Sequence, residues 1–307
     1  MTLHVVVRSY GGENQKRRPS YYSKVLTLSS VVRALARVPE AEAIFLNDGP
    51  VPPDRLALMQ RAGRVVSLGE EPAGMRASYR AALALADTEG WPDEDVVAFV
   101  EDDYLFTEDA FLALVEAVHE LVEVSYFSLY GTRPDEADPA SRHEHSLPRD
   151  WVSAPERRVG ERLWFNRASI TSTFAARVGA LRADLPIFAQ CMRPFRRRFF
   201  DHETCLLYQG VQPYHGRELF FGLPDDFEAS PRGLLRAFVL VPFRMAMNRT
   251  ARRQAEPHLL YTVAPNLATH LEHPVISPDR DWAAVAAEVE AWRAEQAVPR
   301  LDPEEPA

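Results

Sequence analysis

The sequence predicts an α/β fold in which a mainly parallel, mixed sheet is flanked by helices within a single domain. Three observations predict it. Apolar runs of strand length alternate with helix-length amphipathic segments through residues 3–130, their connections are short, and 307 residues suffice for one large domain. Short connections between alternating strands and helices imply right-handed crossovers, and such crossovers join parallel strands.

The expected elements of the first half follow in regular order. Strands are predicted at residues 3–8, 43–46, 64–68, 95–100 and 126–130, where short apolar runs are bounded by polar or turn-forming residues. Helices are predicted between them at residues 20–38, 53–62, 72–88 and 109–122. Ser20 is placed to cap the first helix, and Pro72 suits the first turn of the third.

The second half is less regular. Residues 132–158, rich in proline, charge and histidine, predict a surface excursion, and residues 213–257 show no clear period. Further mixed strands are expected at 163–174 and 180–188, a short helix at 199–209, a last helix at 281–297 and a frayed tail at 299–307.

Composition narrows the class of protein. Hydrophobic residues make up 46% and charged residues 26%, as in an ordinary globular chain, and a formal net charge of −9 argues against a nucleic-acid partner. The two cysteines, Cys191 and Cys205, match no zinc pattern, so a reducing cytoplasm is expected. The start of the chain does not resemble a signal peptide. Residues 234–247 are apolar but carry arginines and a proline, which predicts a core or interfacial element and not a membrane span.

The strongest functional signal is an acidic run at the end of a buried strand. Val96–Val100 leads directly into Glu101, Asp102 and Asp103. Clustered carboxylates repel one another unless a cation neutralises them, and Mg²⁺ and Mn²⁺ prefer such oxygen ligands. Open α/β sheets also bind ligands at the carboxyl ends of their strands. The alternative is that Asp102 or Asp103 caps the next helix.

Other predicted strands end in polar residues at the same edge. Tyr10 could stack on a base, Asp48 could accept a hydrogen bond from a base or ribose, and Arg76 could face phosphate. These are the parts of a nucleoside-diphosphate site. Turn chemistry explains Asn47-Asp48-Gly49 equally well, and Arg76 and Arg80 could be a solvated helix face.

Two segments far along the chain could complete a catalytic site. Asp201 or Glu203, at the start of a predicted helix, could act as general base, although both also suit a helix N-terminus. His270 could join Asp103 around a Mn²⁺-type ion, although a lone histidine is more often structural.

In this order, the motifs resemble the family-2-like glycosyltransferases of the GT-A fold, which is Rossmann-like. The resemblance covers residues 3–130, 201–203 and 265–270. It implies that Arg8, Ser9 and Tyr10 line the nucleotide site, together with Asn47 and Asp48. It also implies that Glu101-Asp102-Asp103 is the DxD motif, in which Asp103 holds the metal and Asp102 touches ribose.

The resemblance further implies a base at Glu203 or Asp201, with the family pattern favouring Glu203, and a metal-ligating histidine at His270. The chain departs from that pattern because Asn47 and Pro50 replace an aspartate and a serine, and His202 separates the two acids of the base helix. Residues 1–131 would then form the nucleotide-sugar half of the domain. Residues 132–298 would form the acceptor and catalytic-base half.

The expected activity is Mn²⁺- or Mg²⁺-dependent transfer of a sugar, with inversion, from a nucleotide-diphosphate donor to a carbohydrate or other hydroxyl acceptor. Trp151, Trp164 and Phe165 could stack on the acceptor or lie in the core. Arg193 and Arg196–Arg198 could face an anionic acceptor or membrane, or be a solvated surface. The alternatives are a nucleotidyltransferase that makes sugar nucleotides and a non-catalytic binding protein. The sequence does not indicate the oligomeric state.

Overall fold

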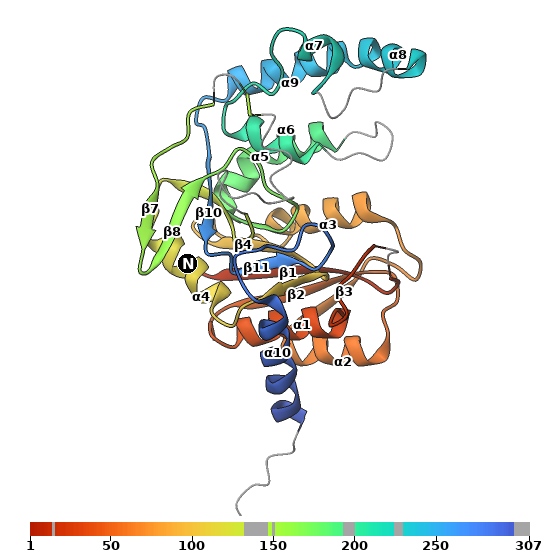
Figure 1. Ribbon diagram of the computed structural model, residues 1–307, viewed down its shortest axis with the longest axis vertical. Helices are drawn as coiled ribbons and strands as arrows, with labels where there is room; N and C mark the ends of the chain where they lie inside the picture. Colours follow the sequence, from red (N-terminus) through yellow and green to blue (C-terminus); the bar gives the residue numbers. More distant parts are fainter. Residues whose placement is uncertain (14–15, 132–146, 149–150, 193–199, 224–229, 298–307) are drawn as a thin grey trace, which may run out of the picture.

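The fold is built on one large mixed sheet. The computed structural model describes residues 1–13, 16–131, 147–148, 151–192, 200–223 and 230–297 (Figure 1). Within these residues, nine strands form a sheet of order β3-β2-β1-β4-β9-β6-β10-β8-β7. Their bounds are β1 Leu3–Tyr10, β2 Glu42–Asp48, β3 Arg64–Ser67, β4 Val96–Glu101, β6 Val124–Ser128, β7 Arg157–Val159, β8 Arg162–Asn166, β9 Phe174–Arg177 and β10 Leu259–Ala264.

The sheet is mainly parallel. β1 pairs in parallel with β2 and β4, β2 with β3, and β6 with β10, whereas β9 lies antiparallel between β4 and β6. Central strands such as β1 are apolar on both faces because helices cover both, and Val5, Val6 and Val7 are fully buried. The predicted fold class is confirmed.

Helices form a layer on each face of the sheet (Figure 1). One apolar core joins the sheet to helices on one face, through residues such as Leu28, Leu58 and Phe111, and a second core joins the other face to Tyr79, Leu181 and Met247. The helices are α1 Lys24–Leu35, α2 Pro53–Ala62, α3 Met75–Thr88, α4 Ala110–Glu120, α5 Val178–Cys191, α6 Asp201–Tyr208, α7 Glu218–Phe221, α8 Pro231–Val239, α9 Val241–Arg253 and α10 Trp282–Ala297.

Several sequence predictions need correction. The first helix begins at Lys24, and Ser23, not Ser20, caps it by accepting a 3.0 Å hydrogen bond from the Leu26 amide. The third helix begins at Met75, so Pro72 precedes its first turn. Residues 180–188 belong to helix α5 and not to a strand, because a short apolar run packs equally well as a buried helix.

The irregular half contains two elements that bear on the site. A short antiparallel pair, β5 Tyr104–Phe106 and β11 Ala268–His270, joins the turn after β4 to the late part of the chain. Residues 213–257, which showed no clear period, contain α7, α8 and α9. Most of the predicted surface excursion, the arginine run at 193–198 and the predicted tail at 299–307 lie outside the described residues. None of the described helices is both long and apolar enough to cross a bilayer.

Candidate functional site

Parallel pairing brings the predicted donor-site residues to one edge of the sheet. In the strand registers, Arg8 lies opposite Glu101, Ser9 opposite Asn47 and Tyr10 opposite Asp48. The strands therefore deliver both the acidic run and the polar end of β1 to the place where open α/β sheets bind ligands.

Each of the three acids lies beside a cationic side chain. Arg8 pairs with Glu101, Lys24 Nζ lies 3.0 Å from Asp102 Oδ2, and an Arg18 terminal nitrogen lies 2.8 Å from Asp103 Oδ2. These pairs relieve the repulsion among the carboxylates within the protein itself. Neither Asp102 nor Asp103 caps the helix that follows, α4, because strand β5 lies between them and that helix.

Asp102 joins strand β1 to the turn after β4. Its Oδ2 accepts hydrogen bonds from Ser9 Oγ at 2.8 Å, the Tyr10 amide at 3.0 Å and Lys24 Nζ. Lys24 also donates to the Tyr10 carbonyl at 2.7 Å, and its ammonium lies 5.4 Å from the Tyr10 ring centroid. Asp102 and Lys24 therefore fix the end of β1, where Tyr10 is 46% exposed and open to a stacking partner.

The structure brings Asp103 and His270 together. Pairing of β5 with β11 places His270 opposite Tyr104, and the two rings stack with centroids 4.8 Å apart. His270 Nε2 then lies 3.0 Å from Asp103 Oδ2. Burial acts to raise the pKa of the Asp103 carboxyl, but hydrogen bonds and charge from His270 and Arg18 outweigh it and hold that pKa well below its usual range.

The donor set at Asp103 fits a cation that the protein holds by two ligands. Asp103 Oδ1 is buried and has no hydrogen-bond partner among the residues that the structure describes, and a carboxylate with an imidazole suits Mn²⁺. Among the described residues, no three His, Cys, Asp or Glu side chains are arranged to hold a metal. Divalent cations at phosphate sites commonly take one or two protein ligands and complete their shell with phosphate and water.

In the turn after β2, the Asp48 side chain holds the backbone of a neighbouring loop. Asp48 Oδ1 and Oδ2 accept hydrogen bonds from the Ala73 and Gly74 amides, at 2.6 and 2.9 Å, so this carboxylate orders the loop before α3. Within the described part of the chain, the buried Asn47 Oδ1 has no hydrogen-bond partner, which leaves it as an acceptor beside Asp48. Arg76 lies half-buried in the first turn of α3.

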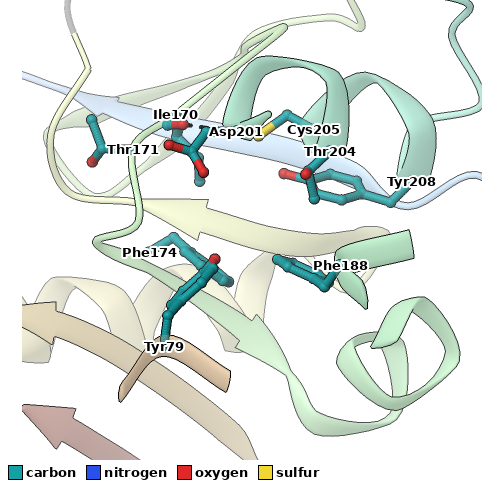
Figure 2. Close-up of a pocket in the computed structure, with 9 residues that line it drawn as sticks. All are labelled: Tyr79, Ile170, Thr171, Phe174, Phe188, Asp201, Thr204, Cys205 and Tyr208. Carbon is teal, nitrogen blue, oxygen red and sulfur yellow. Dashed lines mark hydrogen bonds between the residues drawn. The ribbon is translucent and has the colours of Figure 1, made fainter. Parts of the chain in front are cut away.

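A small cavity, partly open to solvent, is lined by Asp201 at the start of α6. Figure 2 shows the Asp201 carboxylate at the cavity, opposite Tyr79 and Phe174. Burial and the Asp201 charge raise the pKa of Tyr79 well above its usual range, so Tyr79 keeps its proton. Burial also raises the pKa of Cys205 to about 12, which argues against a thiolate nucleophile at this wall.

Glu203 does not line this cavity. Its side chain is fully buried on the opposite side of the first turn of α6, and its Oε1 accepts a 2.6 Å hydrogen bond from the Tyr214 hydroxyl. The sequence left both Asp201 and Glu203 as candidates for the general base. Of the two, Asp201 is the one that a ligand in the cavity would meet.

Two side-chain contacts join the cavity to the strand-end acids. The Arg8 guanidinium lies 4.8 Å from the ring centroid of Tyr79, and the Tyr104 hydroxyl donates a 2.9 Å hydrogen bond to Thr171 Oγ1. Tyr79 and Thr171 both line the cavity. Tyr79 and Thr171 therefore connect the Asp201 cavity to the acidic edge.

The sequence predicts Arg8 at this site but not Arg18 or Lys24, and it leaves open whether three aromatic residues face an acceptor or the core. Arg18 and Lys24 follow the glycine-rich turn after β1, and basic residues there were the only signal for them. Trp164 and Phe165 are buried and pack in the core, so they are not open to an acceptor, whereas Trp151 is half-buried.

Comparison with known proteins gives structural similarity only. No family model and no curated protein matches the chain. Among solved structures, residues 1–349 of S. aureus TarS have 14% identity and a TM-score of 0.42, covering 67% of this chain and 56% of that one. The chain thus spans little more than half of that TarS fragment.

Two further solved structures are similar at the same low level. The galactosyltransferase LgtC, with donor and acceptor sugar analogues, has 13% identity and a TM-score of 0.45, covering 97% of this chain and 98% of that one. Glucosyl-3-phosphoglycerate synthase from Mycobacterium tuberculosis, with Mn²⁺ and UDP, has 15% identity and a TM-score of 0.37, covering 67% and 64%. At this level of similarity, function has to be inferred from the side chains of the site.

Proposed function

We propose that the protein is a glycosyltransferase that moves a sugar from a nucleotide-diphosphate donor to a hydroxyl acceptor. The observation that carries the proposal is that Arg8 and Tyr104, which adjoin the strand-end acids, contact Tyr79 and Thr171 in the lining of the Asp201 cavity. A diphosphate site and a base must adjoin in this reaction, because the base acts on the nucleophile that attacks the carbon bonded to the diphosphate.

The donor would bind along the carboxyl ends of β1, β2 and β4. The exposed Tyr10 ring offers a stacking surface for the base, and the buried Asn47 Oδ1 offers an acceptor for a base or ribose group. Arg76, in the first turn of α3, supplies positive charge toward phosphate.

Asp103 and His270 are the residues that would hold a Mn²⁺ or Mg²⁺ ion. When bound, such an ion would offset the negative charge of the diphosphate as it leaves. Arg18, 2.8 Å from Asp103, adds a fixed positive charge at the same place. Asp102 acts indirectly, since its hydrogen bonds to Ser9 and the Tyr10 amide position the end of β1.

Asp201 is the proposed general base. It accepts the proton of the acceptor hydroxyl as the new bond from oxygen to the anomeric carbon forms and the bond from that carbon to the diphosphate oxygen breaks. Attack from the face opposite the diphosphate would invert the configuration. Tyr79, which keeps its proton, can donate a hydrogen bond to the sugar in the cavity.

Donor-dependent stabilisation tests the donor and metal parts of the proposal. A panel of nucleotide sugars is screened by thermal shift with and without Mn²⁺; a donor at 100 times its Kd stabilises the native state by about 2.7 kcal/mol. The Mn²⁺-dependent part of the shift is expected to disappear in Asp103→Asn and His270→Gln. Asp109→Asn is the matched control, because Asp109 also pairs with an arginine, Arg162, but lies outside the site.

Products distinguish the proposal from its rivals. Release of nucleoside diphosphate from the stabilising donor supports a glycosyltransferase, whereas release of pyrophosphate from a nucleoside triphosphate and a sugar phosphate would indicate a nucleotidyltransferase. If no nucleotide sugar stabilises the wild type, the proposal is wrong.

A further inference from the structure

Helices α7, α8 and α9 form an outer layer with apolar side chains turned to solvent. Figure 1 shows these helices together at one end of the molecule, beyond α5 and α6 and far from α10. The apolar side chains that are at least 38% exposed on them are Phe220, Phe221, Leu234, Leu235, Phe238, Val239 and Met245, which we call the apolar face. Scattered exposed apolar residues are ordinary, but a contiguous patch marks an interaction surface.

Helix α8 turns its apolar side outward. Its buried positions hold the small residues Gly233 and Ala237, one turn apart, whereas Leu234, Leu235, Phe238 and Val239 form the exposed stripe on the other side. Arg232 and Arg236, also one turn apart, lie along the border of this stripe. An amphipathic helix that packs on a core normally shows the reverse arrangement.

This layer is held in place before any partner binds. Arg244 of α9 is buried and donates hydrogen bonds to the carbonyls of Leu219, Phe220 and Ala237, at 3.2, 2.9 and 3.0 Å. These bonds fasten α7 and α8 to α9. The rings of Phe221 and Phe238 lie 6.2 Å apart, so the apolar face continues from α7 to α8.

The charge of the layer is opposite to that of the whole chain. Residues 218–253, which span α7 to α9, contain six arginines and four acidic residues and so carry a net charge of +2, against −9 for the protein. Arg232, Arg249, Arg252 and Arg253 are exposed. Apolar side chains bordered by arginines are the pattern of helices that lie in the plane of an anionic membrane surface.

We propose that α7–α9 form a docking surface for the interface of an anionic lipid bilayer. The apolar face would enter the boundary between headgroups and acyl chains, and the arginines would meet lipid phosphates. Helices α8 and α9 have 9 and 13 residues, well below the ~20 needed to span a bilayer, so they would lie parallel to the surface. Phe243 of α9 packs against Phe200, the residue before Asp201, with ring centroids 5.2 Å apart, which connects this surface to the proposed base.

Vesicle flotation tests this inference and does not depend on the proposed activity. Wild-type protein is mixed with vesicles of phosphatidylcholine alone, or with about one third phosphatidylglycerol, at about 0.05 M and 0.5 M NaCl. Binding is expected only to the anionic vesicles and is expected to weaken at high salt. Leu235→Ser/Phe238→Ser is expected to bind at least ~10-fold more weakly, because it removes two large apolar side chains from the buried area.

A matched control uses exposed apolar residues outside the layer. Val122 and Val152 are 75% and 85% exposed, so Val122→Ser/Val152→Ser should keep wild-type binding. If the Leu235→Ser/Phe238→Ser variant melts below the wild type, Leu235→Ser alone, at a side chain 67% exposed, replaces it. Leu235→Trp adds a direct readout, a blue shift of its fluorescence when anionic vesicles are added.

Three results would overturn the inference. The first is that the wild type does not bind anionic vesicles at low salt. The second is that the control variant loses as much binding as the apolar-face variant. The third is a dimer in sedimentation velocity that Leu235→Ser dissolves while vesicle binding is absent, which would assign the apolar face to a second copy of the chain.

Discussion

Asp201 and Glu203 lie two residues apart at the start of α6. The structure nevertheless predicts that replacing each carboxylate by an amide has opposite effects on kcat and on folding stability. Asp201 lines the cavity and Glu203 is fully buried against Tyr214. We expect Asp201→Asn to lower kcat by about 10²–10⁴-fold, the range for a general base, which is about 3–5 kcal/mol in the barrier. Its free energy of unfolding should change by no more than about 1 kcal/mol, since it loses one half-exposed charge at a helix N-terminus.

Glu203→Gln should show the reverse. It perturbs a buried 2.6 Å hydrogen bond and places an amide NH₂ where a carboxylate oxygen was, which costs about 1–3 kcal/mol of folding stability. Its kcat should stay within about tenfold of the wild type, because this side chain does not meet the cavity.

The assay measures nucleoside diphosphate release at saturating donor and acceptor, together with urea unfolding of the same preparations. Asp54→Asn is the control, because Asp54 is an exposed acid in the first turn of α2, and it should change neither kcat nor stability by much. The assignment is refuted if Asp201→Asn keeps kcat within tenfold of the wild type while Glu203→Gln loses a hundredfold or more.

Two further predictions concern stability. Asp102→Asn leaves the ammonium of the buried Lys24 without its carboxylate and should cost about 3–5 kcal/mol of stability in urea unfolding. The double variant Asp102→Asn/Lys24→Met should recover part of that loss. If the effects of the two single substitutions simply add in this double-mutant cycle, the pairing is contradicted. A hydrogen bond to the buried Asp184 raises the pKa of His258 above its ordinary 6.5. The folding stability that this pair contributes is therefore fully present below pH 6.5 and is lost as the pH rises through the raised pKa. The melting-temperature loss in His258→Gln should therefore be larger at pH 5.5 than at pH 9, with His119→Gln, at an exposed histidine, as control; equal losses at both pH values would refute it.

The first half of the fold could be predicted because local pattern and global fold agree there. Each strand of the parallel sheet is an apolar run, and helix α2 has the predicted bounds Pro53–Ala62. Strands β5 and β11 could not be predicted because three-residue strands carry no readable period. The sequence predicts a strand at residues 180–188, within α5, because a short buried apolar run fits either element. Helices α7–α9 were unreadable because α8 turns its apolar side to solvent.

The site could be predicted by residue type but not by partner. Arg18, Lys24 and His270 meet the acidic run at sequence separations of 78 to 167, and such distant pairing is visible only in the folded chain. Asp102 is paired with Lys24, whereas Asp103 Oδ1 is buried and has no partner among the described residues. Two neighbouring carboxylates of one motif therefore differ in what they can offer a ligand. That difference arises from their partners, since Lys24, Ser9 and the Tyr10 amide all donate to Asp102 Oδ2, whereas Arg18 and His270 both meet Asp103 Oδ2.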